Sequence, residues 1–145
     1  MIEMGSKTAE QQFKEQLEEG LELIIQYEKR GGFVPAVAQD FKTGEILMLA
    51  YVNQQAFEET LKSGYATFWS TSRNELWTKG KKGGDLMEVI EILVDCDQDA
   101  LVYKVEKLCG GACHTKDRNG EARSSCFYRK LGESGTKLKF IETDE

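Results

Sequence analysis

The stretch that decides the fold is "LMEVIEILVDCDQDALVYKVEKL", residues 86–108, in which two apolar runs flank a short acidic segment. Residues 86–94 alternate enough, and contain enough β-branched side chains, to predict a strand, and residues 100–108 predict another. The segment between them carries three aspartates and a cysteine. We therefore expect a strand-rich domain whose chemistry begins where these two strands are joined.

Further predicted elements extend outward from this stretch. Residues 33–53 contain two apolar runs around "FKTG", which predicts a β-hairpin, and Asn53 can cap a helix that Gly64 stops. Residues 65–70 and 76–80 predict strands, and residues 127–131 predict a short last strand. Apolar residues at helical spacing between residues 8 and 30 predict one long amphipathic N-terminal helix.

Length and charge exclude several classes of protein. The chain has 145 residues, enough for one folding unit, and a net charge of −6, which argues against a nucleic-acid binder with a globally basic surface. No apolar run approaches the roughly 18 residues of a membrane span, and the N-terminus has no signal-peptide core, so we expect a cytoplasmic protein without membrane contact. Its four cysteines are then reduced or metal-bound.

The acidic segment favours a hard cation. Asp95, Asp97 and Asp99 alternate in sequence, so an extended backbone would aim all three carboxylates to one side and Cys96 to the other. Adjacent like charges repel unless a cation or solvent offsets them. An EF-hand loop is the rival interpretation, but Ala100 stands where that loop needs glycine. A solvated acidic strand end is the other.

The remaining cysteines and the single histidine suit zinc. Cys113, His114 and Cys126 lie in one polar connection, expected to be exposed, and thiolates with imidazole are typical zinc ligands. The pattern leaves two sites open: a closed structural site that also uses Cys96 and Cys109, or a catalytic site with three ligands and an open position. Buried thiols without metal are a third reading. His114 is well placed for proton transfer or ligation.

A local basic strip, residues 67–82, stands out in the acidic chain. It mixes tryptophans with arginine, lysines and hydroxyl groups, which together can stack on a base and hold phosphate. A nucleotide is therefore a reasonable ligand, although tryptophans in strands more often belong to the core.

Five ordered motifs resemble one enzyme family. "LMLAYVN", "FWSTSRNELWTKG", "VDCDQDAL", "GACHT" and "SCFYR" resemble the phosphoribosyl-AMP cyclohydrolases of histidine biosynthesis over residues 33–131. The resemblance implies an α+β fold, a β-rich pseudobarrel of mixed strands with flanking helices, in an intertwined homodimer with shared active sites. Residues 1–32 would be a helical extension and residues 132–145 a tail.

The resemblance also implies a reaction and its metals. Zinc-activated water would open the N1–C6 bond of the adenine ring of 1-(5-phosphoribosyl)-AMP to give the formimino-carboxamide ribotide, with magnesium as a second cofactor. The implied catalytic residue is His114. The motifs place the zinc ligands on Cys96, Cys113 and Cys126, the first contributed across the dimer, and the magnesium ligands on Asp95, Asp97 and Asp99.

Substrate contacts are predicted on chemical grounds. Arg73 and Lys79 are expected to contact the substrate phosphates, and Trp77 to stack on the base or form a wall of its site.

The chain departs from the family pattern in three places. Cys109 has no counterpart and is expected to be a spare thiol. "KDRNGEA", residues 116–122, lengthens the spacer between the last two zinc cysteines, and "GKKGGDLM", residues 80–87, replaces the expected motif near the substrate.

Overall fold

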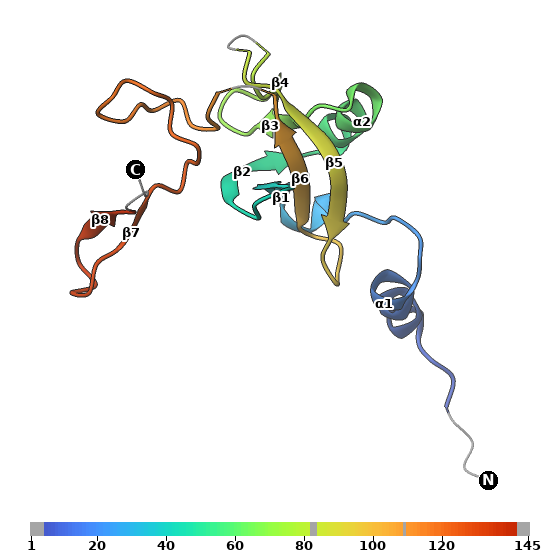
Figure 1. The fold of residues 1–145 in the computed structure, drawn as a ribbon. Coiled ribbons are helices and arrows are strands. Elements are labelled where there is room, and N and C mark those ends of the chain that lie inside the picture. The colour runs from blue at the N-terminus through green and yellow to red at the C-terminus, as the bar shows by residue number, and fades with distance from the viewer. Residues whose placement is uncertain (1–4, 82–83, 109, 142–145) are drawn as a thin grey trace.

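A computed structural model describes residues 5–81, 84–108 and 110–141 of the chain (Figure 1). Cys109 and Lys82, the last residue of the basic strip 67–82, lie outside the described residues. The elements in chain order are α1 (Ala9–Glu19), the 3-10 helix η1 (Tyr27–Arg30), β1 (Val34–Asp40), β2 (Ile46–Val52), α2 (Gln54–Ser63), β3 (Thr67–Ser70), β4 (Glu75–Thr78), β5 (Met87–Val94), β6 (Leu101–Lys107), β7 (Arg129–Leu131) and β8 (Leu138–Phe140).

Six strands form one mixed sheet in the order β4-β3-β2-β1-β6-β5. β1 pairs antiparallel with β2 and parallel with β6, while the other neighbours pair antiparallel. The sheet curls because β5 also reaches the segment entering β3: Val89 N donates to Gly64 O at 2.8 Å, and Tyr65 bridges Glu88. The described residues form a curled half-barrel sheet with two α-helices, which confirms the predicted α+β class. The homodimer stays a prediction.

The core lies inside this curl, under α2. Asn53 caps α2 by accepting from Ala56 N at 2.8 Å, and Gly64 ends it in the left-handed conformation, as predicted. The α2 side chain of Phe57 is buried, as are Phe68 of β3 and Tyr103 of β6, whose ring centroids are 5.9 Å apart. Burial raises the pKa of Tyr103 to about 12.

The N-terminal helix is shorter than predicted. α1 begins at a capping box on Thr8 but ends at Gly20, whose N–H bonds to Gln16 O at 3.0 Å. A Cβ at residue 20 would lie 2.5 Å from that same carbonyl oxygen, so glycine is needed where the chain turns away. The prediction of one helix to residue 30 is therefore wrong beyond Glu19. No residue of α1 is buried.

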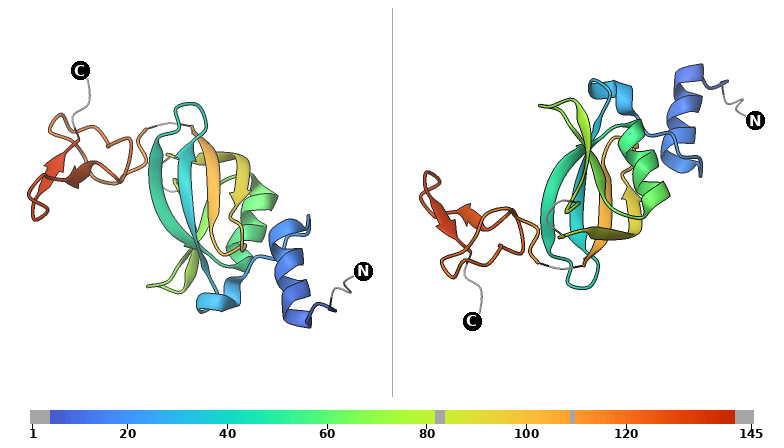
Figure 2. Two further views of the ribbon diagram at one scale, coloured as in Figure 1. Left: turned by 90° about the horizontal axis from the view of Figure 1, so that it is seen from below. Right: turned by 90° about the horizontal axis from the view of Figure 1, so that it is seen from above.

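The C-terminal strands form a separate unit. β7 and β8 pair antiparallel, and the views agree that this hairpin stands apart from the six-stranded sheet, at the end opposite α1 (Figure 2). Among the described residues, no helix has both the length and the apolar character required to cross a bilayer.

Candidate functional site

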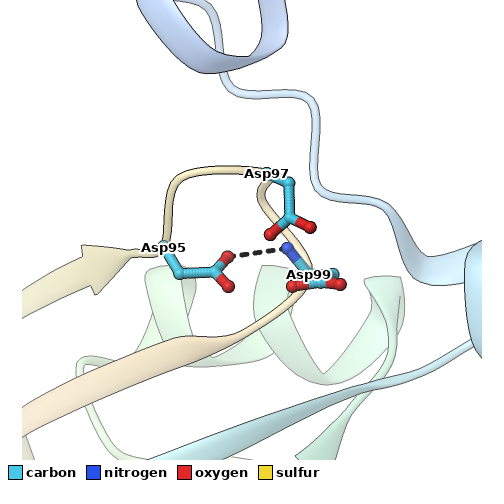
Figure 3. Close-up of side chains that lie close together, drawn as sticks. All are labelled: Asp95, Asp97 and Asp99. Carbon is cyan, nitrogen blue, oxygen red and sulfur yellow. Dashed lines mark hydrogen bonds between the residues drawn. The ribbon is translucent and has the colours of Figure 1, made fainter. Parts of the chain in front are cut away.

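The three aspartates converge in a tight turn, residues 95–100, between β5 and β6 (Figure 3). Asp95 Oδ1 accepts hydrogen bonds from Asp99 N at 2.8 Å and Ala100 N at 3.0 Å, and Gln98 adopts a left-handed φ of 56°. The expected extended backbone is thus wrong, because the alternation falls in a turn. One carboxylate oxygen from each aspartate still lies within 4.8 Å of the others.

This acidic turn is partly neutralised from within the chain. The Lys29 ammonium, at the end of η1, bonds to Asp97 at 3.0 Å and Asp99 at 2.8 Å. The hydrogen bond from Lys29 is the main reason that the pKa of Asp99 falls to about 2. Burial and the neighbouring Asp99 raise the pKa of Asp95. Carboxylate oxygens are the ligands that hard cations such as Mg²⁺ prefer, and those of Asp97 and Asp99 already bind one cationic group, the Lys29 ammonium.

Gln98 ties the N-terminal segment to the acidic turn. Its side chain is buried, accepts from Ile24 N at 2.6 Å and donates to the carbonyl oxygens of Leu17 and Glu22 at 3.1 Å each. Its backbone carbonyl accepts from Gln26 N at 2.7 Å. Residues 17–26 are therefore fixed against the acidic turn, and this places Lys29 of η1 beside the carboxylates of Asp97 and Asp99.

The cysteine loop, residues 111–126, folds back on itself as two antiparallel legs. Cys113 N donates to Arg123 O and Arg123 N donates to Thr115 O, both at 3.1 Å, and Lys116 bridges Ala122. The added residues 116–122 thus form the closed end of a narrow loop. The expectation of an exposed connection is wrong for residues 111–113, which are buried where the first leg meets the second.

The second leg is anchored on β2, which brings two thiols together. Cys126 N donates to Leu47 O at 2.7 Å, and the Ser125 hydroxyl donates to Ile46 O at 2.6 Å. The thiols of Cys113 and Cys126 lie close enough for each to shift the pKa of the other. Partial burial and the neighbouring Cys113 raise the pKa of Cys126 to about 11. Burial alone would raise the pKa of Cys113 too, but hydrogen bonds from Thr115 and Cys126 lower it overall.

Cys96 does not join this pair within the protomer. It lies exposed in the acidic turn at one end of β6, while Cys113 follows the other end, and seven strand residues span about 23 Å. Among the residues that the structure describes, the three aspartates are the one set of three potential ligands with donor atoms close enough for a metal. An EF-hand is excluded, because residues 101–107 form β6 rather than a calcium loop.

The other predicted site residues lie on or beside the β3–β4 hairpin and the cysteine loop. Lys79 forms an ion pair with Asp85 at 3.0 Å, and its positive charge favours the thiolate forms of Cys113 and Cys126. Trp77 packs on Phe68 with ring centroids 5.1 Å apart. His114 is exposed beside Cys113. Arg73 is exposed in the turn that joins β3 to β4, away from Lys79 at the other end of β4.

Sequence reasoning missed the residues that hold these groups in place. Lys29 and Gln98 act on the acidic turn, and Thr115 and Arg123 act on Cys113. None of them belongs to a ligand pattern. Lys29 and the aspartates that it contacts are 68 and 70 residues apart in the chain, so the sequence gives no signal for this ion pair.

Comparisons with known proteins agree on one family. A family model described as phosphoribosyl-AMP cyclohydrolase matches residues 48–128. A phosphoribosyl-AMP cyclohydrolase of Desulfatibacillum aliphaticivorans is 48% identical over 117 residues, covering 81% of this chain and 87% of the relative. One of Methanothrix thermoacetophila is 50% identical over 115 residues, covering 79% and 89%. The histidine biosynthesis bifunctional protein HisIE of Aquifex aeolicus is 48% identical over 108 residues, 74% of this chain and 49% of that protein.

Proposed function

The chain belongs to the phosphoribosyl-AMP cyclohydrolase family, hydrolases of histidine biosynthesis, and we propose that it opens the adenine ring of 1-(5-phosphoribosyl)-AMP at the N1–C6 bond with zinc-activated water. The product is the formimino-carboxamide ribotide. The observation that carries this proposal is the thiol pair of Cys113 and Cys126, held together by a loop anchored on β2.

The thiol pair fits zinc. Thiolates are preferred zinc ligands, and the lowered pKa of Cys113, to which the Lys79 charge contributes, favours the deprotonated form that binds metal. The pKa of Cys126 is raised, so this thiol would lose its proton on binding the metal. Two thiols leave the site incomplete within one protomer. We infer that Cys96 of a second protomer completes it, since Cys96 of the same chain lies at the far end of β6.

His114 is the proposed proton carrier. When bound, zinc supplies the Lewis acidity that lets water attack carbon at neutral pH. The imidazole of His114, exposed beside Cys113, takes a proton from the attacking water and returns it to N1 as the N1–C6 bond breaks. The water oxygen stays on C6, which becomes the carboxamide carbon, and the second water proton goes to the exocyclic nitrogen on C6, which becomes the amide NH2, so no other reactant is needed.

Magnesium is proposed at the acidic turn. Lys29 bonds to one carboxylate oxygen of Asp97 and one of Asp99, and Arg30 lies 3.8 Å from the same oxygen of Asp99. One oxygen of Asp95, by contrast, accepts hydrogen bonds from the backbone of the turn. In a dimer that brings Cys96 to the thiol pair, the acidic turn comes with it, since both are in residues 95–99. The cation then offsets a substrate phosphate or positions water. Lys79 and Arg73 remain the proposed phosphate contacts, and Trp77 the wall of the base site.

A ring-opening assay on the metal-stripped protein tests the reaction. Adding zinc should restore turnover of phosphoribosyl-AMP, and magnesium should raise it further while failing to replace zinc. Cys113→Ala and Cys126→Ala should abolish turnover and zinc retention, with Cys109→Ala, a thiol of the same segment, as the control. Full activity without zinc, or zinc at stoichiometry without turnover, would overturn the proposal, the second result favouring a structural zinc site.

Mixing two inactive variants tests the shared site. In a two-fold dimer, a Cys96→Ala protomer paired with a Cys113→Ala protomer rebuilds one intact site and leaves one doubly damaged. Co-refolding equal amounts should therefore recover about one quarter of the wild-type activity. No recovery, with the mixed dimer demonstrated by mass spectrometry, would show that each site comes from one chain.

A further inference from the structure

Thr115 makes two hydrogen bonds to the sulfur of Cys113. The Thr115 hydroxyl lies 2.9 Å from Cys113 Sγ, and Thr115 N donates to the same sulfur at 3.4 Å. A thiolate carries no proton, so in the metal-binding form the hydroxyl must be the donor. Thr115 thereby fixes where the sulfur lone pairs point, as groups around metal ligands commonly do.

Arg123 in turn holds the Thr115 hydroxyl. Its Nη1 donates to Thr115 Oγ1 at 3.2 Å, which leaves the hydroxyl proton free to point at sulfur. The backbones of the two residues are also bonded, Arg123 N to Thr115 O at 3.1 Å. Among the described residues, no carboxylate oxygen lies within 4.0 Å of Arg123. Within the described residues the guanidinium therefore has no ion-pair partner, and its side-chain hydrogen bond goes to the Thr115 hydroxyl.

Aromatic rings hold the guanidinium where an acidic partner would otherwise be expected. The Arg123 guanidinium lies 4.1 Å from the ring centroid of Tyr128 and 5.6 Å from that of Phe140. The two rings are stacked with centroids 6.2 Å apart. Phe140 belongs to β8, and the β7–β8 pairing with the bond from Ile141 N to Tyr128 O fixes it there.

We propose that Thr115 and Arg123 are positioning residues for the Cys113 thiolate, and that the C-terminal hairpin, through Phe140, holds Arg123 in place. The hairpin, which stands apart from the sheet, then supports the metal site. This inference rests on the zinc site proposed above, and of the residues that it assigns, Phe140 lies beyond the matched family region, which ends at residue 128.

We call the contacts that run from Phe140 through Arg123 and Thr115 to Cys113 the relay. It is tested by the zinc affinity of the purified full chain, measured by competition with a chromophoric chelator. Thr115→Val keeps the shape but removes the hydroxyl and should weaken zinc about 10–100-fold, and Thr115→Ser should restore affinity. Arg123→Met should weaken zinc to a similar degree. Phe140→Leu should have a smaller effect in the same direction, and Phe140→Tyr should have none.

Two controls and a spectrum separate positioning from general damage. Arg129→Met removes the arginine on the same Tyr128 ring, at 5.2 Å, and should leave zinc affinity unchanged. In cobalt-substituted protein, the near-ultraviolet thiolate-to-cobalt band should shift in Thr115→Val and Arg123→Met but not in Arg129→Met. Wild-type zinc affinity and an unshifted band in both variants would overturn the relay alone. A wild-type protein that binds no zinc would overturn both the relay and the proposed function.

Discussion

Replacing Gln98 with alanine should release the N-terminal segment from the acidic turn. The substitution removes three side-chain hydrogen bonds of 2.6–3.1 Å to residues 17–24 and keeps the backbone bond to Gln26 N. A neutral hydrogen bond contributes about 0.5–1.5 kcal/mol net, so three of them give a ceiling of about 4.5 kcal/mol. Water can satisfy part of this exposed segment, so we expect about 2 kcal/mol, or about 30-fold in the opening equilibrium.

Hydrogen exchange followed by mass spectrometry measures this opening directly. Peptides covering residues 17–26 should exchange about 30-fold faster in Gln98→Ala, while β6 should keep its protection because its ladder is intact. Gln26→Ala is the matched control, since that side-chain amide bonds only to the nearby Ile24 O in the described structure. Unchanged exchange in residues 17–26 of Gln98→Ala would show that Gln98 is not what holds the segment.

Three further changes have defined outcomes. Lys29→Met should tighten magnesium binding measured by calorimetry, because the ammonium no longer competes for the carboxylates, and weaker binding would contradict this competition. The same variant has a pH-dependent effect on stability, because the pKa of Asp99 is lowered to about 2. The stabilisation from Lys29 is therefore complete above pH ~4 and lost toward pH ~2, where the urea midpoints of variant and wild type should converge. Tyr103→Phe should leave the free energy of unfolding unchanged or raise it by about 1 kcal/mol in urea titrations, because the buried hydroxyl has no hydrogen-bond partner among the described residues, and a loss of that size would reveal one. Gly111→Ala should open the cysteine loop, because a Cβ would lie 2.3 Å from Arg123 O, so Cys113 should react faster with a thiol reagent, and an unchanged rate would refute the steric argument.

Strands and α2 could be predicted because their signals are local. The hairpin of β1 and β2 follows from two apolar runs around a turn, and α2 carries both its cap, Asn53, and its stop, Gly64. The N-terminal helix was overextended because the helical spacing of apolar residues continues past Gly20. Of the apolar residues after Gly20, Ile25 and Tyr27 pack against the core, whereas Leu21 and Leu23 are exposed.

For the acidic turn, the prediction that the three carboxylates lie together is confirmed, although the extended backbone from which it was argued is wrong. The carboxylates of Asp95, Asp97 and Asp99 do converge, but they do so around a turn that the left-handed Gln98 makes possible. A glutamine gives no sequence signal for that conformation, which favours glycine and asparagine. The placement of Cys96 far from Cys113 depends on strand length and topology, which residue spacing does not reveal.

The parallel pairing of β1 with β6 sets an order on folding. β1 and β2 are joined by a short turn and can pair as soon as both are made, whereas Ala36 must wait for Leu101 to occupy its other edge. During synthesis the central strand of the sheet therefore has an open edge for most of the time that the chain is growing. An open strand edge invites pairing with other chains, so the late arrival of β6 is the step at which aggregation competes most directly with productive folding.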